Sequence, residues 1–289
     1  MLKLKSHIVA ATMGVLALVL SCGSCVSDRR MAAEPTVCVS IGPLKYVVRQ
    51  LAGDIYGVET MTPAGVSPET YQPTPAQIAA LDRCLAYVRV GTLGFEKTTL
   101  RRITENVPHL YQINASAAVP PLEGDCGDDP HAWTSPGTLK LMAGEIARGL
   151  AHIDKHKADT LKVTLAAFEA EMDSLDARLA RQLEGAACRT FLIYHPALGY
   201  FARAYGLKQL AVEHDGKKPS AEHLATLVDQ CRKEGVKVVF VEKEYDPGLV
   251  APIAKEIGAK VVVIDPLSDN PKQQFIDIAK ALCPQTPRR

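Results

Sequence analysis

The chain has 289 residues, a formal net charge of +1 and 47% hydrophobic residues. This composition is typical of a globular protein and excludes a largely disordered chain. With 33 basic residues against 32 acidic ones and 6% aromatic residues, it shows no basic stripe and excludes a nucleic-acid-binding protein.

The first 21 residues are predicted to be a signal peptide. Ile8–Leu20 is an uncharged run of 13 residues, too short to cross a bilayer as a helix. The run leads into Val19-Leu20-Ser21-Cys22, which resembles the bacterial lipobox, with Val where Leu is usual. We expect lipid on Cys22, residues 22–35 as a tether, and a periplasmic or cell-surface lipoprotein anchored to the membrane. An ordinary cleaved signal peptide is the alternative.

The first half of the remaining chain alternates short β-rich runs with helical patterns. The predicted strands are Thr36–Ile41, Val58–Met61, Leu85–Val90 and His109–Ile113. Helices are predicted after Ile41 and over Pro75–Asp82, Phe95–Asn106 and Pro136–Ile153. Thr74 and Ser135 each stand before a Pro and are suited to cap the helices that follow.

Residues 157–184 contain no Gly or Pro and predict one long helix that ends before Gly185. Its apolar residues recur at steps of four and three: Leu161, Leu165, Phe168, Met172, Leu175, Leu179 and Leu183. At about 1.5 Å per residue the helix is roughly 40 Å long. We interpret it as a rigid strut between two α/β halves; the alternative is an ordinary long helix packed on one domain.

The same alternation returns after Gly185. The predicted strands are Arg189–Tyr194, Lys208–Val212, Val236–Val241 and Lys260–Ile264, with helices over Ala197–Tyr205, Ser220–Lys233, Gly248–Ile257 and Lys272–Leu282. Apolar strands that alternate with helices favour parallel sheets. The predicted fold is therefore α/β, with two lobes (residues 36–156 and 185–289), each a mainly parallel four-stranded sheet flanked by helices, joined by the long helix.

Ligands of open parallel sheets bind beyond the carboxyl ends of the strands. The side chains there that carry chemistry are Glu69, His131, His195, Glu213, His214, Glu242 and Asp265. If the two halves face each other, two imidazoles and two carboxylates can hold a divalent transition metal in one cleft. Taken singly, each of these residues is also an ordinary loop or turn residue.

At these positions the sequence resembles the zinc- and manganese-binding solute-binding proteins of bacterial ABC transporters, the ZnuA/TroA type. The resemblance covers roughly residue 36 to the C-terminus. The segments that carry it are Ser67-Pro68-Glu69-Thr70-Tyr71-Gln72-Pro73-Thr74-Pro75, Asp129-Pro130-His131-Ala132-Trp133, His195-Pro196-Ala197-Leu198-Gly199-Tyr200-Phe201 and Asp265-Pro266-Leu267. It implies two lobes, a linking helix, and a metal held between the lobes.

Carried over to this sequence, the resemblance implies four metal ligands: Glu69, His131, His195 and Asp265. Glu69 departs from the family, which usually has His at that position. The loop before His131 also lacks the His-rich insertion of many zinc members. The resemblance favours Zn²⁺, because His195 stands where manganese members tend to have Glu; Mn²⁺ and Fe²⁺ are alternatives. Glu213, His214 and Glu242 are candidates to orient the ligands.

The expected activity is therefore capture of a metal ion, without catalysis, and delivery to an ABC transporter permease by a monomeric binding protein. One alternative is a chelate-binding protein of the same architecture, for a siderophore or corrinoid. Another is a metal-dependent hydrolase. The chain contains no His-Glu-x-x-His or Gly-x-Ser-x-Gly segment, which argues against it. A surface adhesin is a third.

Overall fold

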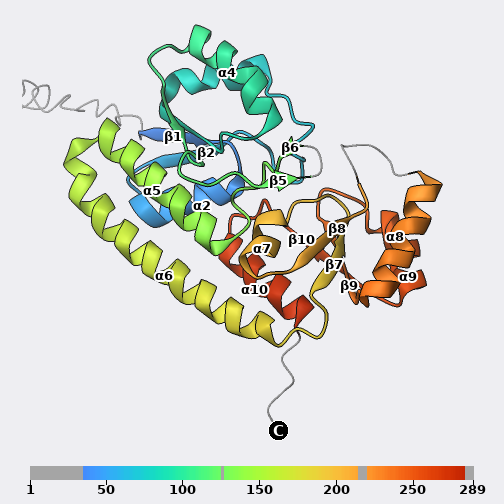
Figure 1. Cartoon of the computed structure of the whole chain (residues 1–289). Helices are drawn as coiled ribbons and strands as arrows, with labels where there is room; N and C mark the ends of the chain where they lie inside the picture. Colours follow the sequence, from blue (N-terminus) through green and yellow to red (C-terminus); the bar gives the residue numbers. More distant parts are fainter. Residues whose placement is uncertain (1–34, 125–126, 214–219, 284–289) are drawn as a thin grey trace, which may run out of the picture. The chain divides into compact units, whose positions relative to one another are not determined.

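A computed structural model describes residues 35–124, 127–213 and 220–283 (Figure 1). The predicted signal peptide, the lipid site at Cys22, the tether up to residue 34, and His214 lie outside these ranges. None of the described helices combines the length and the hydropathy that a membrane span requires.

The first sheet contains four parallel strands in the order β2-β1-β3-β4. They are β1 (Thr36–Val39), β2 (Gly57–Thr60), β3 (Cys84–Arg89) and β4 (Tyr111–Asn114). The helices of this half are α2 (Gly42–Ala52), α3 (Pro75–Ala80), α4 (Gly94–Asn106) and α5 (Pro136–Ile153). Both predicted caps are present: Thr74 accepts a hydrogen bond from Gln77 N, and Ser135 accepts one from Thr138 N. The sequence therefore fixes where α3 and α5 begin.

The second sheet is also parallel, in the order β10-β9-β7-β8. Its strands are β7 (Thr190–Ile193), β8 (Lys208–Ala211), β9 (Val238–Glu242) and β10 (Lys260–Ile264). Its helices are α7 (Gly199–Ala204), α8 (Ala221–Glu234), α9 (Ala251–Ile257) and α10 (Pro271–Leu282). Numbered along the chain within each sheet, both have the strand order 2-1-3-4. The two predicted sheets are confirmed. In each, the chain adds strands first to one side and then to the other, so the strand order reverses between the first and third strands. Such sheets bind ligands at this switch point.

A pair of short strands was not predicted. The loop before His131 contains a two-stranded antiparallel pair, β5 (Glu123–Gly124) with β6 (Gly127–Asp128). The strands have two residues each, too short for a period-2 pattern to reveal them. The pair ends directly before Asp129, so it positions the segment that carries His131.

The long helix is α6 (Ala158–Glu184), and its predicted apolar stripe is confirmed at six of seven positions, while Leu165 is only partly buried against the same core. The six buried residues of α6 are Leu161, Phe168, Met172, Leu175, Leu179 and Leu183. The helix packs against α5 and α2 in the first half and against α10 in the second (Figure 1). One hydrophobic cluster runs from β1 through α6 to α10, and a second covers the far side of the second sheet. Because α6 shares its core with both halves, the halves are joined by packing as well as by the chain. The exact lobe boundaries stay a prediction.

Candidate metal centre

Glu69 lies in the loop that follows β2. Its backbone N donates to Ser67 Oγ at 3.3 Å, a local turn within the loop. Tyr71 fixes the end of the loop: its hydroxyl donates to Met61 O at 2.8 Å, and its ring meets Phe95 edge-on at 5.3 Å between centroids. The loop is therefore attached to its own sheet, and the Glu69 carboxylate projects from a fixed base.

His131 is buried, with 4% of its surface exposed, and Asp129 holds it in place. Asp129 Oδ1 accepts from His131 N at 2.9 Å and faces His131 Nδ1 at 2.7 Å. Thr134 Oγ1 donates to His131 O at 2.9 Å, and the Trp133 ring meets the imidazole edge-on. A carboxylate against Nδ1 places the ring proton there and leaves the Nε2 lone pair free for a cation.

His195 lies two residues beyond β7 and has a matching partner. Its Nδ1 faces Glu213 Oε2 at 3.0 Å, and its backbone N donates to Glu242 Oε2 at 3.3 Å. The Tyr245 ring stacks on the imidazole with 6.0 Å between centroids. This imidazole, too, has its Nδ1 engaged and its Nε2 available.

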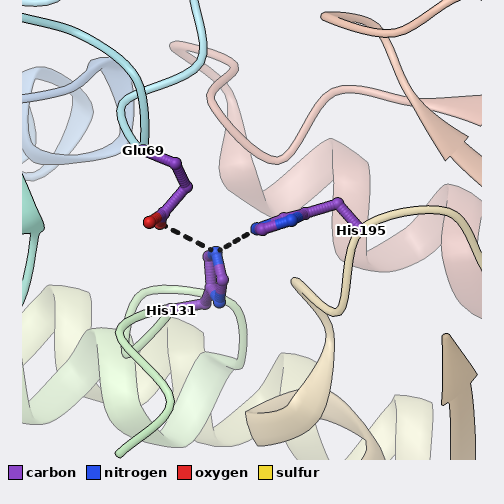
Figure 2. Close-up of side chains that lie close together, drawn as sticks. All are labelled: Glu69, His131 and His195. Carbon is purple, nitrogen blue, oxygen red and sulfur yellow. Dashed lines mark hydrogen bonds and ion pairs between the residues drawn. The ribbon is translucent and has the colours of Figure 1, made fainter. Parts of the chain in front are cut away.

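The two imidazoles and Glu69 converge, and we call these residues the three-residue site. Figure 2 shows the side chains pointing toward one another from three separate segments. His131 Nε2 lies 3.2 Å from His195 Nε2 and 3.5 Å from Glu69 Oε1. Ligand atoms about 2.0–2.1 Å from a tetrahedral zinc ion are about 3.3–3.4 Å apart. Two of the three separations therefore match the edges of a zinc coordination tetrahedron, and the third, between Glu69 and His195, is within 4.8 Å.

The cavity at the three-residue site is small. Its volume is about 20 Å³, and Trp133, Glu242 and Tyr245 are among the residues that line it together with the three-residue site. A single water needs about 10–15 Å³ on the same measure. The cavity therefore has room for a bare ion or a water molecule.

Carboxylates surround this cavity and make it favourable for a cation. Burial lowers the pKa of the His195 imidazole, but its hydrogen bond to Glu213 and the charges of Glu242, Glu213 and Glu69 raise it, and the pKa ends above the ordinary value of 6.5. Burial raises the pKa of Glu242 to about 8. Glu242 Oε1 is buried without a hydrogen-bond partner among the described residues. A positive charge in the cavity offsets the desolvation of these acids.

The predicted site residues fall into three groups. Glu69, His131 and His195 come together, with one ligand atom from each within 4.8 Å of the others. Glu213 and Glu242 both contact His195, as expected of residues that orient a ligand. Asp265 is not part of the three-residue site: its Oδ2 pairs with Lys243 Nζ at 3.3 Å, and it borders a separate cavity of about 350 Å³. Its role as the fourth ligand stays a prediction.

Three side chains that contact the imidazoles were not predicted to do so: Asp129, Trp133 and Tyr245. Asp129 was noted in the Asp129-Pro130-His131 segment but received no role. An acid two residues before a candidate ligand was the available signal, because that spacing lets a carboxylate accept from the ligand's own backbone N. Tyr245 had no signal in the sequence, since it meets His195 only through the pairing of β7 with β9.

Two α/β halves on a shared helix, with an ion-sized cavity lined by imidazoles and carboxylates, define a metal-binding protein of the solute-binding class. The chain belongs to the family described as "Zinc-uptake complex component A periplasmic", which it matches over residues 37–283. It is 26% identical over 262 residues to the zinc-binding lipoprotein AdcA of Streptococcus pneumoniae R6, covering 84% of this chain and 52% of AdcA. It is 25% identical over 291 residues to the high-affinity zinc uptake system protein ZnuA of Bacillus subtilis 168, covering 91% of each.

A crystal structure of ZnuA has the same fold, with 35% identity, a TM-score of 0.81, and coverage of 85% of this chain and 96% of that one. The chain spans about half of the length of AdcA but nearly all of the ZnuA proteins. The similarity therefore covers both halves of the fold and the long helix.

Proposed function

We propose that this protein captures a divalent transition metal, zinc first, in the cavity between its two sheets, and delivers it to an ABC transporter permease. One observation carries the proposal. Two Nε2 atoms lie 3.2 Å apart, each on an imidazole whose Nδ1 faces a carboxylate. With a proton on each Nδ1, two lone pairs point at each other, and a proton or a metal cation between them removes the repulsion.

The ligand types favour zinc over manganese. Imidazole nitrogen suits zinc, and zinc binds a given set of nitrogen and oxygen ligands more tightly than iron or manganese does. The names of AdcA and of the Bacillus ZnuA also state zinc. Glu69 supplies a carboxylate oxygen, which both metals accept, so manganese and iron remain the competing ions.

The size of the cavity supports a bare ion as the ligand. Pockets for organic ligands have about 300–1,000 Å³, whereas the cavity at the three-residue site has about 20 Å³. A siderophore or a corrinoid does not fit there. A hydrolase needs space beside its metal for a substrate, which this cavity does not provide. The protein is therefore proposed as a carrier and not as an enzyme.

The direct test is metal analysis after equilibrium dialysis of the metal-free protein. We expect one zinc per chain, and manganese in excess should not displace it. A protein that takes up no stoichiometric metal contradicts the proposal, and one that prefers manganese from an equimolar mixture contradicts the choice of zinc.

Asp265 is proposed as the fourth ligand, and its pairing with Lys243 does not prevent this. The Lys243 side chain is 62% exposed and that of Asp265 26% exposed. Exposed ion pairs of this kind contribute about 0–1 kcal/mol. A bond to a metal ion therefore outweighs the ion pair, and Asp265 can leave Lys243 for the cation.

Substitution of the two partners separates these roles. Asp265→Asn is expected to weaken zinc binding at least tenfold, measured by competition with a chromophoric chelator, because it removes an anionic ligand. Lys243→Ala removes only the competing partner of Asp265 and should leave the affinity unchanged or slightly higher. If Asp265→Asn binds zinc as tightly as the wild type, three protein ligands are sufficient and Asp265 is not one of them.

Delivery and attachment complete the proposal. The relatives are named as components of zinc uptake systems, which supports a membrane permease as the partner. The lipobox-like sequence ending at Cys22 supports attachment through an N-terminal lipid, and AdcA is itself named a lipoprotein. The protein is proposed to act as a monomer outside the cytoplasm.

A further inference from the structure

The loop between β3 and α4 contacts the segment that carries His131. Thr92 lies in this loop, and its Oγ1 donates to Pro130 O at 2.7 Å across 38 residues of sequence. Pro130 stands between Asp129, whose carboxylate holds the imidazole, and His131 itself. The hydroxyl of Thr92 is therefore hydrogen-bonded to the backbone between Asp129 and His131.

The loop that carries Thr92 is itself fixed by a buried carboxylate. Glu96 is 2% exposed; its Oε1 accepts from Val90 N at 2.7 Å and its Oε2 from Gly91 N at 2.6 Å. Ser40 Oγ donates to Glu96 Oε1 at 2.5 Å and ties the carboxylate to the end of β1. Two backbone N–H groups on one buried carboxylate hold the turn before Thr92 in a single conformation.

Gly91 adds a second restraint to this loop. Its φ is +103°, and a Cβ on it would lie 2.0 Å from Asn114 Oδ1. The close approach to Asn114, at the end of β4, joins the Thr92 loop to the strand from which the chain continues toward His131. The loop is therefore hydrogen-bonded to the end of β1 through Glu96 and lies in close contact with the end of β4.

We propose that Thr92 is a positioning residue for metal capture: its hydroxyl transfers the rigidity of the Glu96-anchored loop to Pro130 and so keeps the His131 imidazole aimed at the cation. Thr92 does not touch the metal and acts through His131. Pro130 has no N–H of its own, so its carbonyl is its only backbone hydrogen-bonding group, and it accepts from Thr92 Oγ1 and from Ala132 N at 2.9 Å. The inference rests on the proposed function, since it concerns the affinity of the same site.

The test compares two substitutions that differ by one hydroxyl. Thr92→Val keeps the shape of the side chain but removes the donor, while Thr92→Ser keeps the donor. Zinc affinity and dissociation rate are measured by competition with a chelator. We expect about tenfold weaker binding and faster release for Thr92→Val, in the range found for groups that orient a metal ligand, and binding within about twofold of wild type for Thr92→Ser.

Thr98→Val is the matched control. Thr98 lies on α4, and its hydroxyl donates to Phe95 O of the same helix at 3.0 Å. This variant loses a similar hydrogen bond without affecting the His131 segment, so its zinc affinity should equal that of the wild type. Thr92→Ala replaces Thr92→Val if the latter does not fold.

A readout that needs no metal separates this inference from the proposed function. Hydrogen exchange at His131 N, which donates to Asp129 Oδ1, should be faster in Thr92→Val than in Thr92→Ser. If the wild type binds no zinc but this exchange difference appears, the proposed function is wrong, whereas the inference that Thr92 holds the His131 segment is supported. Equal exchange in Thr92→Val and Thr92→Ser overturns the positioning role of Thr92. If the wild type binds zinc, equal zinc affinity of these two variants overturns it as well.

Discussion

Replacing His131 with Ala should reduce zinc affinity by more than 100-fold, or at least about 2.8 kcal/mol. The substitution removes an Nε2 that lies close to both other members of the three-residue site, at 3.2 Å from His195 Nε2 and 3.5 Å from Glu69 Oε1. It also leaves Asp129 without the imidazole that faces it at 2.7 Å. A chelator competition titration measures the loss. Thermal denaturation with and without zinc provides a second readout, because a ligand bound only by the folded state raises the melting temperature.

His156→Ala is the matched control, since His156 is an exposed histidine in a short helical turn before α6. It should keep wild-type affinity and the full rise in melting temperature on addition of zinc. Glu69→Ala provides a graded comparison, because Glu69 is the most exposed member of the three-residue site. Stoichiometric, tight zinc in His131→Ala would show that the metal binds elsewhere on the protein.

Replacing Gly199 with Ala should weaken zinc binding about 10–100-fold, although Gly199 is not a ligand. A Cβ at this position would lie 2.1 Å from Asp129 Oδ2 and 3.1 Å from Leu122 Cδ2. The Asp129 carboxylate must therefore move, and the contact from its Oδ1 to His131 Nδ1 is lost with it. Overpacking also destabilises the fold, by about 1–3 kcal/mol, so affinity and unfolding are measured on the same samples.

Gly144→Ala separates the two effects of Gly199→Ala. Gly144 lies within α5, where an added Cβ meets nothing within 4 Å. Alanine there should stabilise the helix by about 0.5–1 kcal/mol and leave zinc binding unchanged. Gly199→Ala with wild-type zinc affinity would mean that the Asp129 carboxylate is not needed to orient His131.

Local pattern predicted most of the fold, because the signals involved are short-range. The stripe on α6 and the caps at Thr74 and Ser135 depend on residues only a few positions apart, and each is present. Most strand ends shifted by one or two residues, as with Val236–Val241, which became Val238–Glu242, whereas Lys260–Ile264 kept its predicted bounds. When both faces of a strand are buried, its sequence shows no alternation, and the apolar run extends beyond the strand. The sequence pattern therefore does not mark where the strand begins or ends.

The site was predicted less completely. The rule that ligands follow the carboxyl ends of strands selected Glu69, His131 and His195, and the structure brings these three together; their role as metal ligands stays a proposal. The same rule selected Asp265 as well, but its side chain faces Lys243. Both residues follow strands of the second sheet, β10 and β9, which are neighbours. The rule indicates at which edge of a sheet a residue lies, but the pairing of adjacent strands decides which neighbour it meets.

The sequence by itself determined two parallel sheets, the long helix between them, and the residue types that face the cleft, because periodicity, caps and strand ends are written within short windows of the chain. Only the tertiary structure decided which of those residues come together. The approach of His131 Nε2 to His195 Nε2 and the contact of Gly199 with Asp129 join residues of different halves, so they depend on how the two halves pack along α6. Contacts between segments that are far apart in sequence are set by that packing, for which no short window of residues carries a signal.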